Sequence, residues 1–204
     1  MFELFFKGGA VMFFLFLCSS AGIYIIVHKF IYFNVHLKPI DLLIKQTKQQ
    51  LASYEQADVI KRLNQKGVLG GTLIAKAIDL SNRDEESIKQ GIQSSTNQEV
   101  PKLEKNLPIL SSLITIAPIL GLMGTVLGLI DIFNVISGGG IGDTQALSGG
   151  IAQALISTVT GLGIAIPFIL CHHYLMHRVD SFLLTVEPLM TDIIYHCKHQ
   201  QPVS

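Results

Sequence analysis

The chain has 204 residues, of which 49% are hydrophobic and only 15% are charged. A water-soluble domain of this size would expose much of that apolar surface, so the composition argues against a soluble globule and indicates a membrane protein. Fifteen basic and fifteen acidic residues balance to zero net charge without a basic cluster, so nothing indicates a nucleic-acid partner. The three cysteines lie in separate segments, which argues against a disulfide framework.

The first apolar segment, residues 8–27, carries no charge and is long enough for one bilayer crossing. A cleaved signal peptide is one alternative, because Lys7 precedes the segment and small residues occupy positions 19–21. A lipoprotein site at Cys18 is another, although Leu17 stands where such sites carry a small residue. Apolar residues continue to Val27 before a basic residue ends the run, so we expect a retained first span.

The next segment, residues 34–106, holds eleven of the fifteen basic residues and predicts an aqueous helical domain. Apolar residues recur at helical spacing over 40–63 and again over 73–80, and we expect the glycines at 67, 70 and 71 to break the helix between them. Ser81 and Asn82, with acids at positions 84–86, then predict a new helix start, where the acids interact favourably with the helix dipole. A solvated spacer and a binding role both stay open for this domain.

Two further apolar stretches predict a second span over 107–136, uncharged up to Ile130, and a third over 144–171, which carries no charge. The connection over 137–143 is rich in glycine. It lacks the Gly-Lys-Ser/Thr ending of a phosphate-binding loop, so we interpret it as a hairpin loop between antiparallel spans.

The basic residues predict the topology. Nearly all of them lie in the 34–106 segment and in the tail, and none lies in the 137–143 loop, so the large segment and the C-terminus should face the cytoplasm. The tail continues at helical spacing but is interrupted by Pro188, and we expect it to pack against the Leu43 or Leu73 stripe. The expected order is a periplasmic start and first span (1–33), a cytoplasmic helical domain (34–106), a second span (107–136), a periplasmic loop (137–143), a third span (144–171) and a cytoplasmic helical tail (172–204).

Small residues form a stripe on each of the second and third spans. The spacing i, i+4, i+7, i+11 is the same in both, and such faces allow helices to approach closely. The two sets are Ala117, Gly121, Gly124 and Gly128, and Ala154, Thr158, Gly161 and Ala165. The repetition predicts a multi-helix assembly rather than a lone anchor.

Polar residues lie beside these stripes. Thr125 is deep in the second span, and Gln153, Ser157, Thr158 and Thr160 crowd the third. A hydroxyl has the alternative of bonding to its own helix, whereas the Gln153 amide cannot be fully satisfied in that way. Pro118 and Pro167 each remove one backbone bond inside a span, which neighbouring helices or water must compensate.

No Asp, Glu, Lys, Arg or His lies in the middle of any of the three spans, so any proton-carrying acid must come from a partner. Two Cys/His groups have spacings that occur in metal sites, but spacing alone is a weak motif, and we predict neither a metal nor a cofactor. These groups are Cys171, His172, His173 and His177, and His196, Cys197 and His199.

The two spans resemble the MotA/TolQ/ExbB proton-channel family. Residues 117–128 (APILGLMGTVLG) are similar to its second-span signature, and residues 150–158 (GIAQALIST) with Gly161-Leu162 and 165–167 (AIP) are similar to its third. The three-span layout resembles the ExbB and TolQ branches, ExbB most, rather than the four-span MotA. The resemblance implies an all-α homopentameric ring in the inner membrane of a Gram-negative cell, lipid-embedded, with an ExbD-like single-span protein in its pore and a TonB-like protein receiving the work.

The resemblance also implies residue roles. Thr125 and Thr158 match the family's pore threonines, and Gln153 stands where ExbB and TolQ typically carry Glu. That departure puts an ExbB identity, or a proton-relay role for this position, in doubt. We therefore expect a non-enzymatic motor scaffold. A TolQ-like envelope role and a structural oligomer without ion flow stay open as alternatives, and no residue in any span could activate a serine for hydrolysis.

Overall fold

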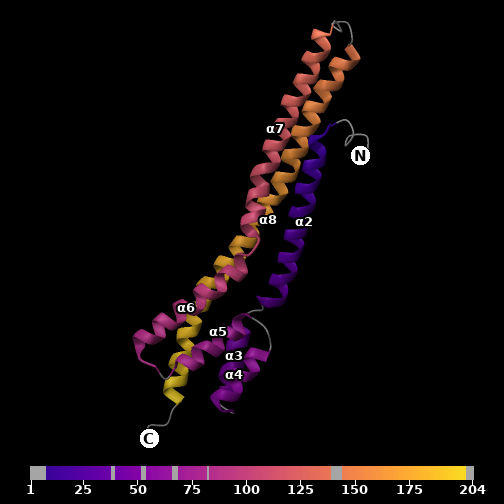
Figure 1. Cartoon of the computed structure of the whole chain (residues 1–204). Coiled ribbons are helices and arrows are strands. Elements are labelled where there is room, and N and C mark those ends of the chain that lie inside the picture. Colours follow the sequence, from indigo (N-terminus) through magenta and orange to yellow (C-terminus); the bar gives the residue numbers. More distant parts are fainter. Residues whose placement is uncertain are drawn as a thin grey trace. The chain divides into compact units, whose positions relative to one another are not determined.

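The computed structural model of the chain describes residues 8–37, 40–51, 54–65, 69–81, 83–138 and 144–200. All regular structure in these ranges is helical (Figure 1). The helices are α2 (Val11–His36), α3 (Ile40–Leu51), α4 (Gln56–Gln65), α5 (Leu69–Leu80), α6 (Glu85–Glu104), α7 (Leu107–Ser137) and α8 (Thr144–Gln200). Three of the described helical stretches are long and apolar enough to cross a membrane. The expectation of an all-helical membrane protein with three such helices is therefore confirmed.

The contacts of the chain divide it into two compact units. The span unit comprises residues up to Val27 together with 106–174, and the helical unit comprises 28–105 together with residues from Leu175 onward. Each unit has its own packing, described in turn below.

In the span unit, α7 and the first part of α8 lie side by side and run in opposite directions (Figure 1). Gly128 approaches Gly150, whereas Ala117 approaches Gly161, as an antiparallel pair requires. Of the expected hairpin loop, residue 137 ends α7 and Gly138 follows in a turn, while 139–143 lie outside the described residues. This part of the chain is a helical hairpin.

The beginning of α2 completes the span unit. Gly22 packs directly on the ring of Phe168 in α8, where a larger residue would collide with the ring. A small core unites α2 with α7 and α8: Val11, Met12, Leu15 and Ala117 are buried in it, and Leu120, Ile156 and Ile164 pack against it. The first apolar segment thus packs on the hairpin instead of standing apart from it.

In the helical unit, α5 is the central helix, and nearly all of its residues are buried. It packs against α3, α4 and α6. Gly70 and Gly71 lie inside this helix, so the expectation that they break it is wrong. A side chain at Gly71 would lie 3.0 Å from the Leu63 carbonyl oxygen, so glycine here lets α4 approach closely. Gly67 lies outside the described residues.

The tail belongs to α8, which continues without a break through Pro188 to Gln200. The expectation that Pro188 interrupts the helix is therefore wrong, because packing on the helical unit outweighs the one backbone bond that a proline removes. Val186 and Met190 are buried with Leu73 around a void of only about 10 Å³. The tail accordingly packs against the Leu73 stripe, as expected.

The start of α6 follows the sequence prediction. Asp84 is its N-cap, and the Asp84 carboxylate accepts a hydrogen bond of 3.1 Å from the Ser87 backbone N–H. The helix ends at Glu104, and Asn106 then adopts a left-handed φ of 70° before α7 begins. This residue separates the last turn of α6 from the first turn of α7.

Candidate functional site

The candidate site is the seam between α7 and α8, where small residues bring two backbones into contact. A Cβ atom added at Gly121 would lie 2.9 Å from the Ser157 carbonyl oxygen, and one at Gly161 would lie 2.6 Å from that of Ala117. Real Cβ atoms do not approach backbone oxygens so closely without a shift of the helices. The two stripes predicted from sequence therefore face each other within one chain.

The part of the seam nearest the 137–143 connection repeats this arrangement. A Cβ atom at Gly128 would lie 2.7 Å from the Gly150 carbonyl oxygen and 3.2 Å from the Cβ of Ala154. Gly124 leaves the space that the Ser157 side chain occupies. Close backbone approach in a bilayer favours van der Waals contact, since lipid supplies no hydrophobic drive for helix association.

Two hydroxyls of α8 cross the seam to a single carbonyl of α7. Ser157 Oγ donates to the Gly121 oxygen at 3.2 Å and Thr158 Oγ1 donates to the same oxygen at 3.3 Å. Both hydroxyls also contact the Ala154 oxygen of their own helix, at 2.9 and 3.3 Å respectively. Ser157 is fully buried and Thr158 half-buried, so Thr158 alone of the two also reaches the surface of the hairpin.

Sequence reasoning placed Ser157 among the polar residues of the span but did not select it for the site. The signal was available in the spacing, because Ser157 precedes Gly161 by one helical turn and so lies on the small-residue face. Its 0% exposure shows that it belongs to the seam.

Thr125 is placed differently. Its hydroxyl donates to the Leu122 oxygen of its own helix at 2.6 Å, and its side chain is half-buried. Thr160 likewise bonds to its own helix, through the Ile156 oxygen at 2.7 Å. The structure thus brings Thr158 to the seam and leaves the Thr125 hydroxyl bound locally, without a hydrogen bond between the two threonines.

Gln153 lies near the start of α8, one turn before Ser157, and is half-buried. Its amide packs over Gly9 at the start of the described chain, where a Cβ atom would lie 2.6 Å from Gln153 Nε2. Gly9 has a φ of +72°, which favours glycine. The amide therefore faces the segment that leads into α2.

The remaining predicted positions have separate surroundings. Ala154 and Ala165 are buried, Pro118 is half-buried and Pro167 is exposed. Both prolines lie inside continuous helices. Of the Cys/His groups, His172 and His173 have ring centroids 6.1 Å apart. Among the described residues, no three His, Cys, Asp or Glu side chains are grouped as a metal site would require.

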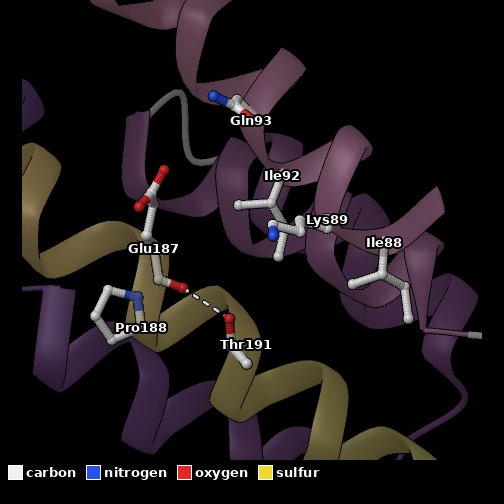
Figure 2. Close-up of a pocket in the computed structure, with 7 residues that line it drawn as sticks. All are labelled: Ile88, Lys89, Ile92, Gln93, Glu187, Pro188 and Thr191. Atoms are coloured by element: carbon white, nitrogen blue, oxygen red, sulfur yellow. Dashed lines mark hydrogen bonds between the residues drawn. The ribbon is translucent and has the colours of Figure 1, made fainter. Parts of the chain in front are cut away.

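A hollow of about 640 Å³ lies between α6 and α8 in the helical unit (Figure 2). Ile88, Ile92 and Pro188 supply apolar lining, and Lys89 and Glu187 bring opposite charges from the two helices. The backbone oxygen of Glu187 accepts the hydroxyl of Thr191 at its edge, at 3.0 Å. None of the residues predicted for the ion pathway lines this hollow, since all of them lie in the span unit.

Comparison with known proteins connects the seam to a family. Residues 55–187, from the start of α4 to the middle of the α8 tail, match the MotA/TolQ/ExbB proton channel family. The chain belongs to this family. The match includes both helices of the seam and excludes α2, so the resemblance predicted from the span signatures is confirmed.

Members of the family that carry two different names are similar to this chain. The biopolymer transport protein ExbB of Aquifex aeolicus is 33% identical over 135 residues, covering 64% of this chain and 91% of that protein. The Tol-Pal system protein TolQ of Haemophilus influenzae is 38% identical over 85 residues, covering 42% and 37%. A Synechocystis protein named ExbB-like 3 is 30% identical over 137 residues, covering 64% of each. The matched parts thus span less than two thirds of two of these relatives.

Proposed function

We propose that this chain is the scaffold subunit of a proton-driven membrane motor of the ExbB type. The observation that carries the proposal is the seam itself: two spans of a proton-channel family, tightly packed through glycines, with the Thr158 hydroxyl reaching across it. Thr125 adds a hydroxyl elsewhere on α7, bound to its own helix, and no titratable side chain lies between positions 106 and 130. Hydroxyls can pass and orient protons but cannot store charge, so the storing group must come from elsewhere.

The partner that supplies this group is, in our proposal, an ExbD-like protein with one span and one membrane carboxylic acid. Gln153 is consistent with such a division of labour, because it places a neutral amide where related subunits typically carry Glu. The amide donates and accepts hydrogen bonds at all pH values in the cell. The scaffold then needs only to hold the partner's acid near the threonines.

The oligomer we propose is a homopentameric ring in which α7 and α8 line the pore. The outward faces of the hairpin support association in the membrane, because they are strongly apolar and exposed in the single chain. Leu122, Val126 and Leu155 are 61%, 52% and 61% exposed. In a ring, part of this surface contacts neighbouring copies and the rest contacts lipid.

The membrane and the orientation complete the proposal. We place the chain in the inner membrane of a Gram-negative bacterium, with the N-terminus and the 137–143 loop in the periplasm and the helical unit in the cytoplasm. The distribution of Lys and Arg supports this orientation. Protons would then flow past the threonines toward the cytoplasm, and this flow would move the partner helices. The movement would transmit energy to a TonB-like protein for outer-membrane transport.

The experiment that tests the proposal compares Thr158→Val with Thr160→Val in the assembled complex. Both changes keep the side-chain shape and remove one hydroxyl, but only Thr158 reaches the seam, whereas Thr160 bonds to its own helix. We expect Thr158→Val to abolish uptake that depends on the proton motive force while the complex still assembles, and Thr160→Val to retain it. Normal uptake by Thr158→Val contradicts the assigned role.

A second experiment separates this motor from a structural oligomer. Proteoliposomes that contain the chain and its single-span partner should acidify when a proton gradient is imposed, and those with Thr158→Val should not. A proton flux that stays at the background level in both preparations would favour an oligomer without ion conduction.

The alternative role in the same family is the TolQ type, which the similarity to TolQ over 85 residues supports. Deletion of the gene distinguishes the two roles. Loss of energy-dependent uptake with an intact envelope supports the ExbB type, whereas detergent sensitivity and defective envelope constriction with normal uptake support the TolQ type.

A further inference from the structure

Lys29, near the end of α2, is buried although it follows directly on an apolar run. Its side chain is only 3% exposed, whereas a lysine at a membrane edge ordinarily extends its ammonium group into water. Among the buried polar residues that the structure describes, Lys29 alone carries a formal charge. Burial of an ammonium group is costly unless partners compensate it, so the position of Lys29 indicates a specific role.

The ammonium group binds the end of α6. Lys29 Nζ donates to the Leu103 carbonyl oxygen at 2.6 Å and lies 3.5 Å from that of Lys102, and both residues belong to the last turn of the helix. The last carbonyls of a helix lack intrahelical donors and form the negative end of the helix dipole. A lysine ammonium group at this point donates hydrogen bonds to these carbonyls and is attracted to the negative end of the dipole.

The chain itself offers little to this helix end. Asn106 turns into the left-handed region with a φ of 70°, so the helix cannot continue. Pro108 stands four residues after Glu104 and has no N–H to donate to the Glu104 carbonyl. The last turn of α6 therefore depends on a side chain from another helix.

Aromatic rings from the following turn of α2 also stabilise the cation. Lys29 Nζ lies 5.2 Å from the ring centroid of Tyr32 and 5.4 Å from that of Phe33, within the range of cation–π attraction. Phe33 and Leu103 are themselves buried, at 2% and 0% exposure, so they exclude water from the contact. Carbonyls, helix dipole and aromatic faces together compensate the buried charge.

We propose that Lys29 is a positioning residue that clamps the last turn of α6 to α2. The clamp acts two residues before the helical unit ends at Lys105, and α7, the helix that carries Thr125, begins two residues further on at Leu107. Through this clamp, a movement of α6 is transmitted to the start of the second span, α7. The coupling to transport rests on the proposed function, whereas the clamp itself does not.

Hydrogen–deuterium exchange of the full chain in its membrane complex tests the clamp. We expect Lys29→Met, which keeps length but removes charge and donor, to speed exchange of the amides of residues 102–105 by on the order of tenfold or more. Lys29→Arg should retain most of the protection, because its guanidinium can still donate. The matched control is Lys105→Met, which removes an exposed positive charge close to the same helix end. Wild-type exchange in Lys29→Met overturns the clamp.

Transport measured on the same variants tests the coupling. We expect Lys29→Met to lose most energy-dependent uptake with the complex assembled, Lys29→Arg to restore it, and Lys105→Met to leave it unchanged. Faster exchange with full uptake in Lys29→Met overturns the positioning role. If Lys29→Met fails to accumulate, Lys29→Leu, which also lacks a donor, replaces it, and wild-type exchange in that variant counts against the clamp. If Thr158→Val transports normally, the proposed function fails while the exchange result still decides the clamp.

Discussion

The Ser157 hydroxyl and the Gly121 carbonyl oxygen lie 3.2 Å apart across the seam of α7 and α8. The bond is possible only because residue 121 lacks a side chain, since a Cβ atom there would lie 2.9 Å from the Ser157 carbonyl oxygen. Glycine therefore does more than permit close packing. It exposes a backbone acceptor to a neighbouring helix at a buried position, where Ser157 is 0% exposed.

The first prediction concerns this approach. Gly121→Ala should destabilise the hairpin by about 1–3 kcal/mol, because the methyl group meets backbone atoms that cannot move independently. The gain in helix propensity, at most about 1 kcal/mol, offsets only part of this cost. Thermal unfolding of the purified complex in detergent measures the change.

Gly163→Ala is the matched control. It lies in α8 two residues after Gly161, and a Cβ atom there would meet nothing within 4 Å. We expect its unfolding temperature to equal or exceed that of the wild type. A similar loss of stability in both variants would show that glycine content, rather than the seam, matters.

Sequence alone predicted much of the hairpin. The spacing of Gly121, Gly124 and Gly128 gave the correct packing face, because a helix has a fixed period and small residues tolerate close neighbours. The same reasoning failed for Gly70 and Gly71. Glycine inside a helix costs little enough for burial to outweigh it, and the contact with Leu63 that requires Gly71 comes from a different helix.

The polar contacts were less predictable. Ser157, Thr158 and Thr160 are alike in sequence, and only the direction of each side chain relative to α7 separates two seam hydroxyls from one that bonds to its own helix. Lys29 was not predicted at all. Its acceptor is a backbone carbonyl 74 positions away, and a carbonyl leaves no signal in the residue type.

The second prediction concerns the cap of α6. Hydrogen bonds from the Ser87 hydroxyl and, second, from the Ser87 backbone N–H lower the pKa of the Asp84 carboxyl below its ordinary value. The folded state is therefore favoured by this group above the ordinary pKa of Asp, near 4, and the advantage is lost as the pH falls through the lowered value. We expect amide protection at Ser87 to decline over that acidic range.

Asp84→Asn tests the cause. Asparagine can cap a helix but does not titrate, so protection at Ser87 should persist in this variant and be independent of pH over the same range. Asp84→Ala should lack the protection throughout. Parallel declines in the wild type and Asp84→Asn would assign the pH dependence to another group.

The last prediction separates the two hydroxyls that share the Gly121 oxygen. Ser157→Ala removes a fully buried hydroxyl and should cost on the order of 0.6 kcal/mol, the typical value for a hydrogen bond between membrane helices. The loss stays small because the Thr158 hydroxyl, also within reach of that oxygen, remains as its partner. The double variant Ser157→Ala, Thr158→Val leaves the oxygen without either hydroxyl, so it should lose more stability than the two single variants combined. Unfolding of the four proteins under identical detergent conditions completes this double-mutant cycle. Strict additivity would mean that the two hydroxyls act independently, whereas transport should be lost only in the proteins that carry Thr158→Val.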